Sequence, residues 1–171
     1  MAHYYDSIPE PVRKLTNAQA VERYAAGAEV PGKAIAGLTT EQLRAFPVPG
    51  TWSIQQIVAH LTDSDLIAAY RMKRIIAEER PKLDLWDENA FVPGLRYQDQ
   101  PAREVCELFR LNRTVLAHIL RGLPDADFER TAIHQEMGPM TLGQFLRIYV
   151  NHLDHHMAFL KKKRELLGSP L

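Results

Sequence analysis

Apolar residues recur at steps of three and four along most of the chain, a spacing that predicts amphipathic helices joined by turns. Ser53 and Thr141 are each followed three residues later by glutamine, the capping-box pattern that begins a helix. Pro31-Gly32 interrupts the first stretch, so we expect a kink or two pieces there. The four predicted helical stretches span about residues 16–37, 53–79, 101–121 and 141–167.

The segments between these helices are long, and they carry turn residues. Residues 39–43 predict a short extra turn, and residues 81–99 form a connection long enough to suggest a functional loop. Residues 128–140 have an extended pattern with a turn at Gly138-Pro139, which is compatible with a short β-hairpin. The sequence therefore predicts an all-α protein, a four-helix bundle with long connections and room for a hairpin before the last helix.

Composition narrows the class of protein. The chain has 171 residues, of which 46% are apolar, so we expect a single domain over residues 1–171 with an ordinary core. Lys plus Arg and Asp plus Glu both number 21, and the formal net charge of zero argues against a nucleic-acid partner. The basic run at 161–164 is expected to stay solvated and to complement the dipole of the last helix.

The single cysteine and the N-terminal sequence bear on location. Cys106 excludes an intramolecular disulfide, falls in a helical pattern and is expected to be a buried apolar filler in a reducing cytoplasm. The first six residues lack a basic region followed by an apolar run, so we expect no signal peptide. No apolar stretch approaches the roughly 20 residues that cross a bilayer, so we expect no membrane association.

A pair of histidines in the last predicted helix is the main candidate for chemistry. His152 and His156 are four residues apart and so project from one face, on an apolar stripe that includes Phe145, Tyr149 and Phe159. Two imidazoles at this spacing can bind one divalent metal ion. The alternative is a pair of core histidines that hydrogen bond within the protein, because a buried polar ring needs a partner.

His60, about two turns into the second predicted helix, is the best candidate for a third ligand. Ile57 and Leu61 lie on the same side, so the imidazole can face the bundle interior. Asp63 is three residues further on and could accept the second N–H of His60, as metal-bound histidines usually require. The alternative is a histidine at the edge of the core with Asp63 as a surface acid.

These motifs resemble the DinB-like superfamily and, within it, the YfiT-like metal-dependent hydrolases. The segment from Trp52-Ser53 through His60 and Asp63 carries the resemblance. The acidic loop at 81–88 and the closing segment 141–156 also carry it. Their order and spacing extend the resemblance over roughly residues 15–167.

The resemblance implies one divalent metal ion on His60, His152 and His156, with zinc or nickel as the first choice and iron or manganese also compatible. It further implies a small-molecule substrate, a hydrolase or a thiol-dependent S-transferase reaction, and a homodimer. Many relatives follow the histidine pair with Arg-Gly-Gln, but this chain has Met-Ala-Phe at 157–159, so no single relative's substrate carries over.

A metal ion on neutral imidazoles lowers the pKa of a bound water or thiol, so one site could support either reaction. Glu88 is the favoured general base, ahead of Asp87 and Asp63, although such acids are more often solvated side chains of a polar loop. His155 is expected to hydrogen bond behind the ligands or else to be exposed. Two alternatives stay open: a metal- or ligand-binding bundle without turnover, and a purely structural bundle.

Overall fold

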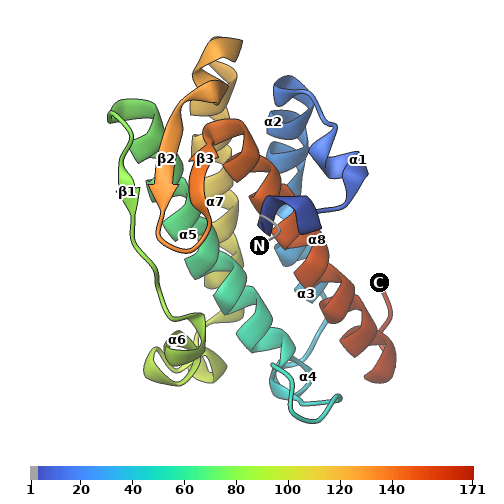
Figure 1. Cartoon of the computed structure of the whole chain (residues 1–171). Coiled ribbons are helices and arrows are strands. Elements are labelled where there is room, and N and C mark those ends of the chain that lie inside the picture. Colours follow the sequence, from blue (N-terminus) through green and yellow to red (C-terminus); the bar gives the residue numbers. More distant parts are fainter. Residues whose placement is uncertain (1–3) are drawn as a thin grey trace.

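The computed structural model describes residues 4–171, and its long helices run side by side (Figure 1). The all-α four-helix bundle expected from the sequence is confirmed. The expectation of no signal peptide rests partly on residues 1–3, which lie outside the described residues. The bundle is built from α2 (Asn17–Ala26) continued by α3 (Val30–Ile35), α5 (Ile54–Ala77), α7 (Ala102–Arg121) and α8 (Leu142–Leu166).

Short elements fill the connections between the long helices. The 81–99 connection contains a strand, a helix and a 3₁₀ turn, which the sequence did not predict. Within residues 4–171, no helix combines the length and the apolarity that a membrane crossing needs. The short helical elements are α1 (Glu10–Arg13), α4 (Thr40–Arg44), α6 (Glu88–Gly94), and the 3₁₀ turns η1 (Tyr4–Ser7), η2 (Gly27–Glu29), η3 (Tyr97–Asp99) and η4 (Asp125–Glu129).

The expected hairpin before the last helix is confirmed and belongs to a small sheet. Strands β2 (Thr131–His134) and β3 (Gly138–Thr141) pair antiparallel, with His134 opposite Gly138. The turn was predicted at Gly138-Pro139, but both residues are already paired in β3, and the turn falls at 135–137. Strand β1 (Lys82–Leu83) pairs parallel to β2, so the 81–99 connection is fixed to the hairpin.

Capping boxes begin α5 and α8, as the sequence predicts. The Ser53 hydroxyl accepts from the Gln56 backbone N–H at 3.1 Å, and the Gln56 side chain accepts from the Ser53 N–H at 2.9 Å. Thr141 and Gln144 make the same pair of bonds at the start of α8. These caps fix where the two site-bearing helices begin.

The break in the first helical stretch lies earlier than predicted. It falls at η2 (Gly27–Glu29), because Pro31 sits in the first turn of α3, where a missing N–H is tolerated. Gly27 is required by close packing: a Cβ there would lie 2.6 Å from the Arg113 guanidinium and 2.7 Å from the Leu153 side chain.

A buried ion pair lies at the level of the bundle where two apolar clusters meet. Arg113 and Asp65 are each 1% exposed, and the guanidinium donates to the carboxylate at 2.9 Å. Tyr24 and Asn112 also donate to this carboxylate, and Arg113 donates to the Tyr149 carbonyl. The pair therefore links α2, α5, α7 and α8.

Two expectations about α8 were wrong. Phe159 is 52% exposed, so the buried stripe ends at His156, and Leu160 instead continues the core. Only part of the basic run is solvated, since Lys163 and Arg164 are buried. Their charges are satisfied by the Thr51 hydroxyl and by backbone carbonyls, which lets them pack against the preceding loops.

Candidate metal centre

Three histidines from two helices meet inside the bundle. His60 projects from α5, and His152 and His156 project from successive turns of α8. One ring nitrogen of each lies within 4.8 Å of the others. The three residues selected from the sequence are therefore brought together by the fold.

The spacing of these nitrogens suits a single small cation. His60 Nε2 and His152 Nε2 are 3.2 Å apart. Tetrahedral zinc with bonds of about 2.0–2.1 Å places its nitrogen ligands about 3.3 Å from one another. The ring centroids of His156 lie 4.7 Å from His60 and 4.6 Å from His152, so small side-chain rotations would complete the geometry.

All three imidazoles are held in the neutral form that binds metals. Burial lowers the pKa of His60 to about 4. Burial, and then the neighbouring histidines, lower the pKa of His156 to about 3 and that of His152 well below its ordinary value. The rings are therefore free bases near neutral pH, and no proton has to be displaced before a cation binds.

The hydrogen bonds made by the three rings distinguish a metal site from ordinary core histidines. Among residues 4–171, the only hydrogen-bonding contact of the three rings is the one between His60 and His152, and His60 Nδ1 is buried without a partner. The predicted bond from His60 to Asp63 is therefore absent, and the Asp63 carboxylate accepts from the Tyr97 hydroxyl at 2.6 Å. Core histidines would be expected to find protein partners, so this arrangement fits a cation better.

Two tryptophans enclose the cluster. Trp52 contacts His60 with ring centroids 4.8 Å apart and stacks on His156 at 6.2 Å. Trp86 also stacks on His60, with ring centroids 5.9 Å apart. These apolar side chains help to bury the ring of His60, which is 1% exposed, and this burial is the cause of its lowered pKa.

Glu88 and His155 each lie close to one of the three rings. Glu88 is the first residue of α6 rather than a loop residue, and its Oε2 is 3.9 Å from His60 Nε2. Burial, with a contribution from Asp87, raises the pKa of Glu88. His155 is exposed and makes edge contacts with the rings of His156 and Phe159.

A cavity of about 1090 Å³ opens beside His152 and Glu88. Its walls come from α5, α6, α8 and the β2–β3 hairpin. Sequence reasoning missed Arg71 and set His134 aside as unconnected, because only the tertiary fold brings them here. The polar side chains that line the cavity are Ser64, Arg71, Asp87, Glu88, Asn89, His134, Glu136, Tyr149 and His152.

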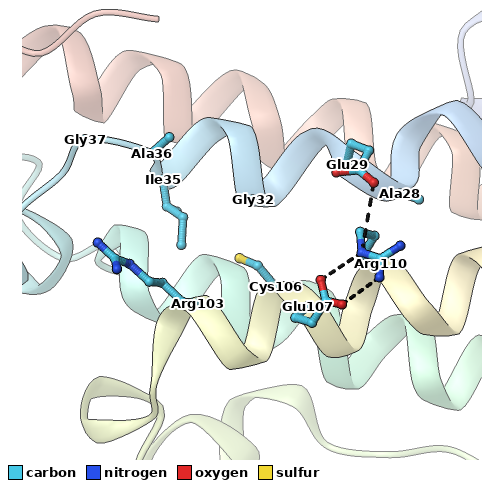
Figure 2. Close-up of a pocket in the computed structure, with 10 residues that line it drawn as sticks. All are labelled: Ala28, Glu29, Gly32, Ile35, Ala36, Gly37, Arg103, Cys106, Glu107 and Arg110. Atoms are coloured by element: carbon cyan, nitrogen blue, oxygen red, sulfur yellow. Dashed lines mark hydrogen bonds and ion pairs between the residues drawn. The ribbon is translucent and has the colours of Figure 1, made fainter.

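A separate hollow of about 330 Å³ lies between α3 and α7, where Cys106 points toward Ile35 (Figure 2). Burial raises the pKa of the Cys106 thiol to about 12, so it stays protonated and is a poor nucleophile. The nearby Arg110 is neutralised by Glu107 and Glu29. The expectation that Cys106 is a buried filler is confirmed.

The fold and the site together define a class: a four-helix bundle with three histidines from two of its helices that could hold one metal ion. A sequence profile described as "DinB superfamily" matches residues 32–160. The chain belongs to the DinB superfamily.

Named relatives support the same assignment. "Putative metal-dependent hydrolase YfiT" of Bacillus subtilis is 32% identical over 146 residues, covering 82% of this chain and 81% of the relative. A Bacillus licheniformis protein with the same description is 35% identical over 138 residues, 79% and 77% of the two chains. The resemblance predicted from the motifs is confirmed.

A solved structure shares the fold. It is described as "YfiT from Bacillus subtilis is a probable metal-dependent hydrolase with an unusual four-helix bundle topology". It superposes with a TM-score of 0.84 at 24% identity, covering 95% of this chain and 91% of that one.

Proposed function

We propose that this protein is a metal-dependent enzyme in which His60, His152 and His156 hold one divalent ion. The single observation that carries the proposal is the convergence of three neutral ring nitrogens from α5 and α8. The descriptions of the relatives as metal-dependent hydrolases point the same way. Imidazole ligands suit zinc, nickel and iron, and the family resemblance makes zinc or nickel the first choice, with iron or manganese also possible.

An ion held by neutral imidazoles would keep its full charge and lower the pKa of a bound water or thiol. Glu88 is the residue of this chain best placed to move a proton there, since Oε2 lies beside His60 Nε2. Its raised pKa makes the carboxylate a stronger proton acceptor than an ordinary glutamate. The cavity beside His152 is large enough for a small-molecule substrate.

We favour hydrolysis, with transfer to a low-molecular-weight thiol as the second reaction of the same site. Cys106 cannot supply that thiol, because it is buried and faces the hollow between α3 and α7 (Figure 2). A thiol co-substrate would therefore have to enter from solution through the cavity.

Metal content tests the ligand set. The protein is stripped with a chelator, reconstituted with zinc or nickel, desalted and measured by elemental mass spectrometry. We expect about one equivalent in the parent and a large loss in His60→Ala, His152→Ala and His156→Ala. His155→Ala is the matched control, because it removes an exposed histidine from the same helix and should leave one equivalent. Parental metal content in all four variants would refute the proposal.

Turnover separates an enzyme from a bundle that binds metal without reacting. The loaded protein is assayed with ester and amide substrates, and with a small thiol plus an electrophile. Activity that needs the ion and falls in the His152→Ala variant would support catalysis. One equivalent of metal with no turnover in either assay would favour the binding protein instead.

A homodimer and a cytoplasmic location belong to the proposal as well. Leu108, Leu111 and Val115 form an exposed apolar stripe on α7, a surface that a second copy could cover. Sedimentation of the parent beside Leu111→Glu tests this, since a dimer through this face should dissociate. The single buried thiol suits a reducing compartment.

A further inference from the structure

A buried arginine faces the cavity without a carboxylate partner. Arg71 of α5 is 6% exposed and lines the cavity, yet no acidic oxygen of residues 4–171 lies within 4.0 Å of its guanidinium. One of its nitrogens donates to the Asp84 carbonyl, and the Tyr149 hydroxyl is within hydrogen-bonding reach. A guanidinium has five N–H donors, so several stay available to a ligand.

His134, at the end of β2, adds a second donor to the cavity lining. Its Nδ1 accepts from the backbone N–H groups of Glu136 and Met137, each at 3.3 Å. In the neutral ring the proton must then be on Nε2, because Nδ1 is occupied as an acceptor. His134 is 5% exposed and lines the cavity, so this N–H is a fixed donor there.

Three exposed acidic side chains line the same cavity. Asp87, Glu88 and Glu136 line it and are exposed, so they lie toward solvent, whereas Arg71 is buried. A buried cation is stabilised by an anion that fits its planar fork. These acids, with Glu136 only two residues from His134, disfavour a group with two negative charges, which leaves a singly charged carboxylate as the best match.

We propose that Arg71 and His134 form a carboxylate-binding subsite in the cavity beside the three histidines, so that the substrate carries a carboxylate at some distance from its reacting group. This inference rests on the proposed function, because it deepens the same site. It also orients the substrate, since the carboxylate would be held at one wall while the reacting group faces His152.

Weak-binding titrations of the full-length protein test the subsite. Butyrate and its neutral counterpart butyramide are titrated against the protein with and without zinc, and the histidine ring signals are followed by NMR. Charge-assisted hydrogen bonds should favour butyrate by about tenfold in both forms. Arg71→Met should lose this preference. His134→Gln, which keeps an N–H donor, should retain more of it than His134→Leu.

Arg74→Met is the matched control. Arg74 is one turn further along α5, is paired with Glu78 and also donates to a carbonyl of the 81–99 connection, that of Lys82. This variant should keep the parental preference for butyrate. Circular dichroism and zinc content show whether each variant is folded. Loss of the preference in both arginine variants would overturn the subsite.

Two further outcomes separate this inference from the proposed function. Equal binding of butyrate and butyramide by zinc-loaded parent protein would overturn the subsite and leave the metal centre intact. A preference for butyrate in protein that binds no zinc would support the subsite and refute the metal proposal. Tighter binding of propyl phosphate than of butyrate would overturn the choice of a carboxylate.

Discussion

Acid should destabilise the metal-free protein through His60. The ordinary pKa of histidine is 6.5, and burial lowers that of His60 to about 4. As the pH falls below 6.5, His60 becomes protonated in the unfolded chain, whereas in the folded chain it stays neutral until about pH 4. The unfolded state therefore binds more protons in this window, and stability falls with pH. At pH 5.0 this difference amounts to about 2 kcal/mol for His60 alone.

Urea unfolding at pH 7.5 and pH 5.0 measures this effect in protein stripped of metal. The parent should lose about 2 kcal/mol more than His60→Gln between these pH values, because the glutamine cannot titrate. His118→Gln, at an exposed position on α7, is the control and should behave like the parent. Equal losses in the parent and His60→Gln would mean that His60 is hydrated in the folded state, which would refute the account of a dry metal centre.

Three other variants test the packing and the chemistry. Arg113→Met leaves the buried Asp65 carboxylate without its cationic partner and should lower the free energy of unfolding, measured in urea, by about 3–5 kcal/mol. A loss below about 1 kcal/mol would show that the ion pair is solvated. Gly27→Ala should lower the free energy of unfolding by about 1–3 kcal/mol. Gly32→Ala should leave it unchanged, because the new Cβ would be 3.9 Å from its nearest neighbour, and equal effects of the two variants would contradict the close approach at Gly27. Glu88→Gln should lower kcat about 10²–10⁴-fold with unchanged metal content, and an unchanged kcat would remove Glu88 as the base.

The helices and the histidine cluster could be predicted because their signals are local. A hydroxyl residue with glutamine three positions later fixes a helix start wherever the helix packs, as at Ser53 and Thr141. The four-residue spacing of His152 and His156 places them on one face without any tertiary information. His60 needed more than spacing, and its place opposite that pair was an inference from the family resemblance.

What the sequence could not show depends on contacts between distant segments. Strand β1 has two residues, too few for a periodic signal, and it exists because β2 offers a free edge. Arg71 looks like any charged residue of a helix, and only the fold shows that it is buried against the cavity. Asp63 was paired with His60 by sequence distance, but its carboxylate accepts instead from Tyr97, 34 residues away.

The buried ion pair connects the stability of the bundle to the geometry of the metal centre. Asp65 follows His60 by five residues on α5, and Arg113 donates at 3.1 Å to the carbonyl of Tyr149, three residues before His152 on α8. The pair therefore fixes how α5 and α8 are aligned, and this alignment sets the distance between the ligand nitrogens. Metal sites tolerate displacements of only about 0.5 Å. Arg113→Met should accordingly weaken metal binding, although Arg113 makes no hydrogen bond to any of the three histidines.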